Sequence, residues 1–257
     1  MNRLAAMTWS EAQGAFSQAA LAILPTGSIE QHGPHMALET DIAVASGLAE
    51  QLADDLGHLA VLCPRLDYGL SEHHMHFPGT LTLRPETYQR LLLDIIESLA
   101  HWGLRRVLVV NGHGGNIDAL RLVSRVARRD VGSLVASVMW ARIAADEVAK
   151  RVSSPSYGHA CESETSVAMA VAPGVVYADR IVAPGERRSG DPLTDPPAPR
   201  VDQAVLLHEW SDDGALGDPR LATLEDGRAI VDVVAARTLE FARRFAWQPL
   251  PHPPEGR

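Results

Sequence analysis

Short apolar runs alternate with helical patterns along most of the chain. The runs that predict buried strands are residues 21–24, 59–63, 107–110 and 134–139. The stretches with apolar residues at helical spacing are residues 42–56, 84–102, 117–129, 141–151 and 221–247. The clearest strand is 107–110, because all four residues are apolar and three are β-branched.

Strands joined by long helices are expected to run parallel. The helix carries the chain back to the end of the sheet where the previous strand began, so the next strand runs in the same direction. The alternation therefore predicts an α/β fold, a three-layer α/β/α sandwich with a mainly parallel sheet. The length of 257 residues favours a single domain over residues 1–248, with a disordered tail over residues 249–257. Residues 183–218 are rich in Pro, Gly and Asp and predict a long excursion from that domain.

Composition excludes several classes of protein. The 23 Lys and Arg against 32 Asp and Glu give a formal net charge of −9, which argues against a nucleic-acid partner. No apolar run approaches the roughly 20 residues of a membrane helix, and residues 1–20 lack the pattern of a secretory signal. We therefore expect a cytoplasmic protein without a membrane partner. Two cysteines exclude a disulfide scaffold and a cysteine-rich zinc site, and leave one disulfide or one reactive thiol as the alternatives.

Histidine is the residue type that points to chemistry. The chain has 11 histidines, and several gather in four short stretches rich in Gly, Pro, Asp or Glu. The histidines in these stretches are His32, His35, His73, His74, His76, His113 and His159. Histidines used only for packing or solubility would not be expected to gather in this way.

The first stretch, residues 27–35, is followed by Asp41 at the start of a predicted helix. Glu30 and His32 are two residues apart after a predicted strand, so the alternation of side chains sends both to the same face. Asp41 can cap the helix with one oxygen and ligate with the other. A carboxylate, an imidazole and a second carboxylate suit a divalent metal that takes mixed nitrogen and oxygen ligands. The alternative is a solvated polar turn.

The second stretch follows the strand at 107–110, and its His113 stands at the carboxyl end of that strand, where open parallel sheets bind ligands. Gly112, Gly114 and Gly115 leave the backbone uncovered for a metal or a substrate. A phosphate-binding loop is the alternative, but the residues match neither the dinucleotide fingerprint nor the Walker lysine pattern. An esterase would need a Gly-x-Ser-x-Gly elbow, and none occurs.

The third stretch, residues 159–166, carries a histidine and two carboxylates, His159, Glu162 and Glu164, at a predicted helix start. That order is typical of metal ligands or of a general base, although the helix dipole also favours acidic residues in any first turn. The fourth stretch, residues 72–80, contains three histidines beside a Phe-Pro-Gly turn that suits a pocket wall. We predict that His74 and His76 contact substrate.

Taken together, these four motifs and residues 214–219 resemble the creatininase (creatinine amidohydrolase) family over about residues 20 to 245. The resemblance implies the creatininase-type α/β/α fold, metal-dependent amidohydrolase activity and a homohexamer. The Gly-Gly form of the second motif is closer to the mycofactocin-system members and the formylaminopyrimidine deformylases than to creatininase itself.

The resemblance also implies a set of metal ligands. One metal would take Glu30, Asp41 and His113, and the second would take His32 and share Asp41. In creatininase the second metal also takes a glutamate at the position of Gly115, so this chain needs a substitute and creatinine is not the expected substrate. The substitute that we predict is Glu164, with Glu162 as the second choice.

The implied reaction is hydrolysis of the C–N bond of a small amide, formamide or cyclic amide by a water that two divalent cations activate. Zinc is the first expectation, with manganese or Fe(II) as alternatives. His159 and Glu164 are the predicted catalytic residues, and His159 would carry the proton to the leaving nitrogen. Further substrate contacts are predicted at Trp140, Glu162, Gly114 and Gly115. The alternative function is a non-catalytic binding subunit with a structural metal.

Overall fold

Five parallel strands form one sheet in the order β1-β3-β2-β4-β5. The computed structural model describes residues 2–154, 158–186, 188 and 203–251. The strands are β1 (Asn2–Arg3), β2 (Leu21–Thr26), β3 (Ala60–Leu62), β4 (Arg106–Asn111) and β5 (Leu134–Met139). The four predicted strands are confirmed, whereas β1 has only two residues and gave no periodic signal.

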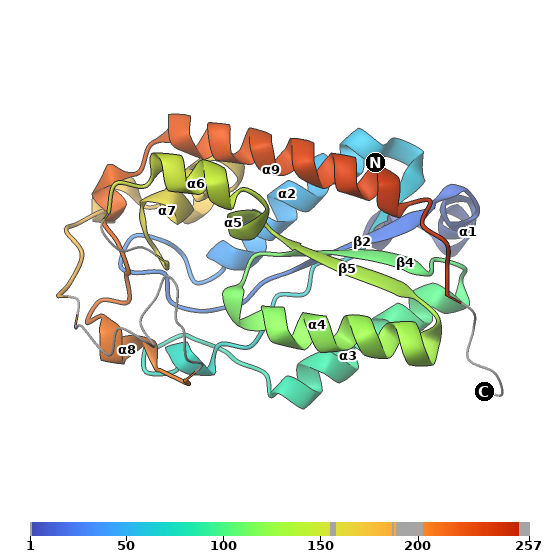
Figure 1. Ribbon diagram of the computed structural model, residues 1–257, viewed down its shortest axis with the longest axis horizontal. Helices are drawn as coiled ribbons and strands as arrows, with labels where there is room; N and C mark the ends of the chain where they lie inside the picture. Colours follow the sequence, from blue (N-terminus) through green and yellow to red (C-terminus); the bar gives the residue numbers. More distant parts are fainter. Residues whose placement is uncertain (1, 155–157, 187, 189–202, 252–257) are drawn as a thin grey trace.

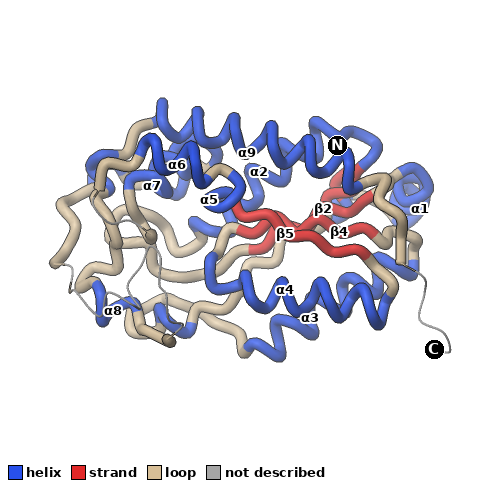
Figure 2. The backbone as a smooth tube through the Cα atoms, in the orientation of Figure 1, coloured by secondary structure: helices blue, strands red, loops and turns tan. Residues whose placement is uncertain are grey.

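Helices cover both faces of this sheet (Figures 1 and 2). The α-helices are α1 (Trp9–Gln18), α2 (Thr40–Leu56), α3 (Pro85–His101), α4 (Ile117–Val126), α5 (Trp140–Ile143), α6 (Ala145–Arg151), α7 (Glu162–Val171), α8 (Leu207–Trp210) and α9 (Leu224–Phe245). In Figure 1, α2, α7 and α9 lie above the sheet, and α3 and α4 lie below it. The predicted three-layer sandwich is therefore confirmed.

Several helix boundaries differ from the predicted ones. The helix expected over residues 141–151 is two helices, α5 and α6, because Ala144 leaves the helical conformation. Helix α7 begins at Glu162, within the stretch 159–166 where a helix start was predicted. Helix α1 was not predicted, because it buries only Ala15 and therefore has little apolar periodicity.

Side-chain alternation divides the core into two clusters, one on each face of the sheet. Leu21 and Ile23 of β2 pack in the cluster with α2 and α9, whereas Ala22 and Leu24 pack in the cluster with α3 and α4. This double burial explains why the central strands read as continuous apolar runs.

The connections of the sheet reverse direction at the carboxyl ends of β2 and β4. These strands are neighbours, with Thr26 opposite Asn111, but α2 leaves β2 toward one face and α4 leaves β4 toward the other. Open α/β sheets bind ligands at such a reversal, because the two departing helices leave space above the strand ends.

Two glycines let the first turn of α2 pack against the turns that follow β2 and β4. A Cβ atom on Gly27 would lie 2.4 Å from the backbone nitrogen of Ile42, and one on Gly112 would lie 2.1 Å from the backbone oxygen of Asp41. Neither distance is possible for a real side chain, so the turns after β2 and β4 have to be glycine at these positions. The contact brings Asp41 directly above the strand ends.

The ends and the outer surface add little to the site. Of the predicted tail over residues 249–257, residues 252–257 lie outside the described part of the chain, while the carbonyl of Pro251 accepts a 2.8 Å hydrogen bond from Arg105. Residues 187 and 189–202 of the predicted excursion also lie outside the described part of the chain.

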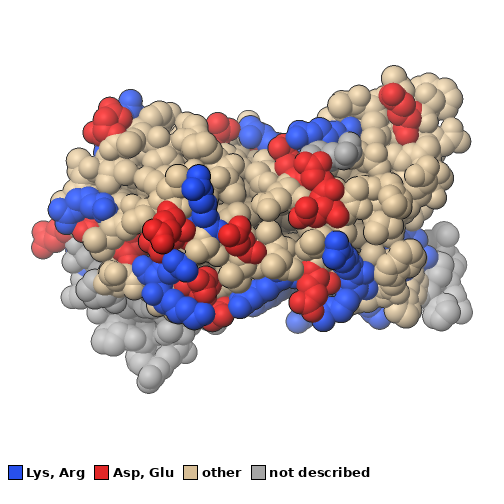
Figure 3. Space-filling view, turned by 90° about the horizontal axis from the view of Figure 1, so that it is seen from above, with Lys and Arg blue, Asp and Glu red and all other residues tan. Residues whose placement is uncertain are grey.

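Acidic and basic side chains are interspersed on the face of the molecule shown in Figure 3. None of the described helices is both long and apolar enough to cross a bilayer.

We predict that Gly112→Ala lowers the free energy of unfolding by about 1–3 kcal/mol, because the new methyl group forces α2 away from the strand ends. The control is Gly14→Ala in α1, where no atom lies within 4 Å of the added Cβ and the free energy of unfolding should stay within about 1 kcal/mol of the original or rise. Urea unfolding of the metal-free protein measures both. Equal stability of the two variants would contradict the proposed close packing.

Candidate metal centre

Carboxylates and imidazoles gather at the carboxyl ends of β2 and β4. Glu30 and His32 come from the loop after β2, Asp41 from the first turn of α2 and His113 from the turn after β4, and all four are buried. His159 and Glu164 reach the same place from the start of α7. The loop after β2 is held by isolated bridges, so Glu30 and His32 converge through loop geometry and not through strand alternation.

Asp41 stands between two histidines. Its Oδ1 lies 3.1 Å from His32 Nε2, and its Oδ2 lies 3.0 Å from His113 Nδ1. The Oδ2 atom is buried and has no hydrogen-bond partner of good geometry among the described residues. A buried carboxylate oxygen without such a partner is costly, so this atom requires a cation or a proton.

The outer nitrogen of each central imidazole is close to a backbone carbonyl. His32 Nδ1 is 3.1 Å from the carbonyl of Glu30, His113 Nε2 is 2.8 Å from that of Leu70, and His159 Nε2 is 2.7 Å from that of Gln31. A carbonyl only accepts, so these nitrogens donate their hydrogens. In the neutral ring the other nitrogen then presents a lone pair to the cluster, which is the arrangement of a metal-ligating histidine.

The donor atoms form two sets that share Asp41. Glu30, Asp41 and His113 make one set, and His32, Asp41 and Glu164 make the other, with the possible ligand atoms of each set within 4.8 Å of one another. A further set joins Glu30, His32 and His159. Lone pairs facing carboxylate oxygens at about 3 Å repel unless a cation lies between them, so the residues present fit a divalent metal with nitrogen and oxygen ligands.

Protons hold these charges together when no metal is bound. Burial alone lowers the pKa of His32, but Asp41, Glu164 and Glu30 raise it to about 10. The carboxylates of Glu30 and Asp41 likewise overcome the effect of burial and raise the pKa of His113 well above its ordinary value. Burial raises the pKa of Asp41, and the neighbouring His32 and His113 outweigh it and lower that pKa. A divalent cation would replace the protons on these imidazoles.

Two residues that the sequence interpretation did not single out hold the ligands in place. Ser71 Oγ donates a 2.5 Å hydrogen bond to Glu30 Oε2. The amide of Asn116 donates to the carbonyl of Gly27 at 3.0 Å and accepts from the N–H of Leu70 at 3.0 Å, so it joins the loops after β2, β3 and β4. Their only signal in the sequence was their position beside the histidine-rich stretches.

Glu164 reaches the cluster from the first turn of α7. Its Oε1 lies 3.9 Å from His32 Nε2, and its Oε2 accepts a 2.6 Å hydrogen bond from the N–H of Ala160. Ala160 has a φ of 48°, an uncommon conformation that no other described non-glycine residue adopts. The turn that brings both His159 and Glu164 to the site is therefore held in a strained conformation, partly by the Glu164 carboxylate.

The two glycines of the second motif have different environments. Gly114 is exposed, and no atom lies within 4 Å of a Cβ built on it. A Cβ on Gly115 would lie 2.3 Å from the carbonyl oxygen of Leu70 and 2.5 Å from His113 Nε2. Only Gly114 thus leaves the backbone open, and a glutamate at position 115 would break the hydrogen bond that orients His113.

Of the predicted substrate contacts, His74 lies at the cluster, and its Nε2 is 3.4 Å from Glu30 Oε1. Burial and the neighbouring His159 lower the pKa of His74, so it stays neutral there.

The structure does not bring three other predicted residues to the cluster. Trp140 is buried in the core beside α9, since its large apolar ring is more stable there than in a polar crevice. The Glu162 carboxylate accepts hydrogen bonds from the N–H and the Oγ of Ser154 at 3.1 and 2.6 Å. His76 is exposed and stacks on His208, with 4.0 Å between ring centroids.

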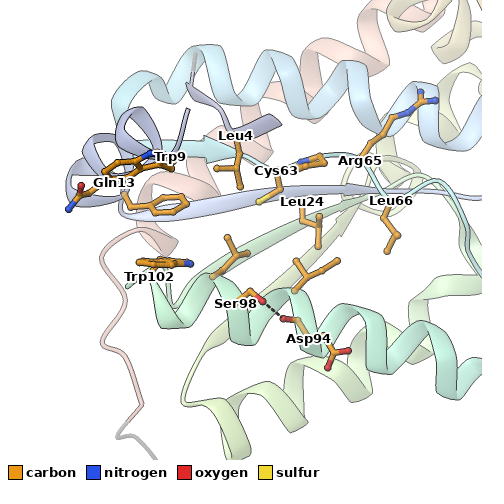
Figure 4. Close-up of a pocket in the computed structure, with 15 residues that line it drawn as sticks. Leu4, Trp9, Gln13, Leu24, Cys63, Arg65, Leu66, Asp94, Ser98 and Trp102 are labelled. Atoms are coloured by element: carbon orange, nitrogen blue, oxygen red, sulfur yellow. Dashed lines mark hydrogen bonds between the residues drawn. The ribbon is translucent and has the colours of Figure 1, made fainter. Parts of the chain in front are cut away.

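An apolar groove of about 730 Å³ lies between α1 and α3, and its lining does not include the cluster (Figure 4). Trp9 and Trp102 stand at one end of it, and Cys63 and Leu24 form part of its floor. None of the clustered carboxylates or imidazoles lines this groove, so cavity size does not locate the candidate chemistry.

Residues 5–242 match the Creatininase family, described as creatinine amidohydrolase. A mycofactocin precursor peptide peptidase of Mycobacterium ulcerans is 35% identical over 218 residues, which cover 81% of this chain and 78% of that protein. The creatinine amidohydrolase of Pseudomonas putida is 29% identical over 248 residues, which cover 88% and 90%. A deformylase of Methanococcus voltae that acts on a formylaminopyrimidine matches over a shorter stretch, 28% identical over 112 residues that cover 42% of this chain and 41% of its own.

Solved structures give the same result. A mutant creatininase in a Zn–Zn form superposes with a TM-score of 0.77 and a Mn form of creatininase with 0.76, each 25% identical to this chain. Each superposition includes 96% of this chain, together with 98% of the Zn–Zn form and 99% of the Mn form. The resemblance inferred from the motifs is confirmed, and the peptidases are more similar to this chain than the Pseudomonas creatininase is. The chain belongs to the creatininase family and is a hydrolase of carbon–nitrogen bonds.

Proposed function

We propose that this protein is a metal-dependent amidohydrolase that cleaves the C–N bond of a small amide, formamide or cyclic amide with an activated water. The observation that carries the proposal is the position of Asp41, whose two oxygens face imidazole nitrogens of two different ligand sets. Such a shared carboxylate is what two neighbouring cations require.

In this proposal Glu30, Asp41 and His113 hold one divalent cation, and His32, Asp41 and Glu164 hold the other. Zinc is the proposed metal, with manganese or Fe(II) as alternatives, and the matched zinc and manganese forms of creatininase support the first two. When bound, such cations lower the pKa of water and polarise a carbonyl group.

The protein supplies the proton transfers. The outer N–H of His159 is held by the carbonyl of Gln31, so its inner Nδ1 is available to accept a proton from the attacking water. The same atom then gives this proton to the nitrogen that leaves when the C–N bond breaks. The Glu164 carboxylate lies 3.9 Å from His159 Nδ1 and stabilises the protonated ring between these two steps.

The substrate is proposed to be a small molecule with an amide carbonyl, and the backbone at Gly114 is the open side of the turn. Creatinine is not the proposed substrate, because the family glutamate is replaced by Gly115 and its side chain has no room here. A homohexamer is the assembly that the family resemblance suggests, and the cytoplasm is the proposed location.

The second candidate is a non-catalytic subunit in which the metal holds the loops together, and the glycine at position 115 keeps this candidate open. An enzyme should hydrolyse formanilide, acetanilide or the cyclic amide dihydrouracil, lose that activity with a chelator and regain it with added zinc. A structural site should instead lose thermal stability as the main effect of the chelator. Absence of metal-dependent hydrolysis of all three probes, with a large loss of stability, would favour the second candidate.

Asp41→Asn is predicted to reduce the zinc content from two ions per chain to less than one and the hydrolysis rate by at least a hundredfold. The reason is that a neutral amide cannot neutralise both cations. Elemental analysis after dialysis measures the metal. Asp118→Asn, an exposed carboxylate on α4, is the matched control and should keep both ions. Full metal content and activity in Asp41→Asn would contradict the two-metal proposal.

His159→Gln is predicted to keep both metals and to lower kcat by about 10² to 10⁴, the usual contribution of a positioned acid or base. The metal stays because the two sets that share Asp41 do not include His159. Elemental analysis gives the metal content of the variant, and steady-state kinetics on the same sample give its kcat. If the variant loses metal in proportion to its activity, His159 is a ligand and not the proton carrier.

A further inference from the structure

His74 is oriented in the opposite sense to the other imidazoles of the cluster. His32, His113 and His159 each donate their outer N–H to a backbone carbonyl and turn the other nitrogen inward. The outer atom of His74 is Nδ1, and its neighbour is not a carbonyl but Nε2 of the Gln31 amide at 3.0 Å.

Two backbone groups fix the orientation of the Gln31 amide. The N–H of Gly33 donates to Gln31 Oε1 at 2.9 Å, and Gln31 Nε2 donates to the carbonyl of Gly214 at 3.2 Å. Exchanging the oxygen and the nitrogen of this amide would set donor against donor at Gly33 and acceptor against acceptor at Gly214. The side that faces His74 is therefore the NH₂ group.

Gly214 makes this arrangement possible. It has a φ of +83°, and a Cβ placed on it would lie 1.9 Å from Gln31 Oε1. The amide of Gln31 packs directly on this bare backbone, which leaves it no room to turn. The late motif at residues 214–219 that contributed to the family resemblance thus acts on the site through Gln31.

An NH₂ group can only donate, so His74 Nδ1 has to accept and the hydrogen of the neutral ring has to be on Nε2. This Nε2–H points to the cluster, 3.4 Å from Glu30 Oε1, which is longer than a normal N–H···O hydrogen bond. His74 is only 2% exposed, and its ring centroid lies 4.6 Å from that of His159. The donor is therefore held beside the proposed proton carrier.

We propose that His74 is a further catalytic residue, whose Nε2–H donates a hydrogen bond to the carbonyl oxygen of the amide substrate, and that Gln31 is the residue that positions it. This inference rests on the proposed amidohydrolase function. As water adds to the carbonyl carbon, the C=O π electrons move to the oxygen, and a fixed neutral donor stabilises the charge that develops there. When the C–N bond breaks, the C=O double bond forms again and the hydrogen remains on His74 throughout.

The tautomer of His74 is tested first on the unsubstituted metal-free and zinc-loaded protein. Long-range ¹H–¹⁵N correlation spectra should show His74 with a protonated Nε2 and an unprotonated Nδ1, the signal being assigned by its absence in His74→Gln. In Gln31→Glu the hydrogen should move to Nδ1, because a carboxylate accepts where the amide donated. A protonated Nδ1 in the unsubstituted protein, or no change in Gln31→Glu, would overturn the proposal.

The role of the donor is tested with acetohydroxamate, a probe with a carbonyl oxygen that binds zinc enzymes without being turned over. Calorimetric titration of the zinc-loaded protein should show about tenfold to a hundredfold weaker binding in His74→Phe and in Gln31→Glu. His74→Gln, which keeps an N–H near the same place, should recover most of the affinity. The matched control is His58→Phe at an exposed position, which should bind as the unsubstituted protein does.

Elemental analysis of each variant distinguishes a donor from a structural residue, because His74→Phe should retain both zinc ions. Equal acetohydroxamate affinity in His74→Phe and the unsubstituted protein would overturn the role of His74 and leave the proposed function intact. Absence of metal-dependent hydrolysis of all probes would contradict the proposed function. The tautomer of His74 and the affinity for acetohydroxamate can still be measured in that case, so the two failures are distinguishable. If His74→Phe does not fold, the spectra and the Gln31→Glu titration decide.

Discussion

The structure is organised around one buried carboxylate, Asp41, which is 3% exposed and faces an imidazole nitrogen with each of its oxygens. Such a charge is stable away from water only if positive charge stands beside it. The first turn of α2 can deliver this carboxylate to the strand ends only because Gly27 and Gly112 have no side chains. Backbone packing in the centre of the fold and charge balance in the site are thus parts of the same arrangement.

The hydrogen bonds around the cluster divide its imidazoles by role. Three rings are anchored through their outer N–H on loop carbonyls and offer lone pairs inward, whereas His74 is anchored by a donor and offers a hydrogen inward. The groups that impose this difference are backbone atoms and the amide of Gln31, not the rings themselves. The same residue type therefore supplies proposed ligands, a proposed proton carrier and a proposed hydrogen-bond donor.

Packing also explains how this chain differs from creatininase within the family. The space beside Gly115 is filled by the carbonyl of Leu70 and by the ring of His113, so a carboxylate cannot enter from that turn. Glu164 instead approaches His32 from the start of α7, on a turn that Ala160 completes in a strained conformation. In the proposed centre, Glu164 therefore supplies from the start of α7 the ligand that Gly115 cannot supply, and Asp41 remains the shared carboxylate.

The sequence by itself determined the layers and the candidate ligands. Apolar runs and helical spacing fixed four strands, most helices and the parallel sheet, because these patterns follow from burial on one or both faces of an element. Glu30, His32, Asp41 and His113 were found by residue type and by position after strands. The tertiary structure decided which way each side chain turns. It placed Trp140 in the core, tied Glu162 to Ser154 and gave Ser71, Asn116 and Gln31 their roles. These outcomes depend on contacts between residues that are distant along the chain, and local periodicity carries no information about such contacts.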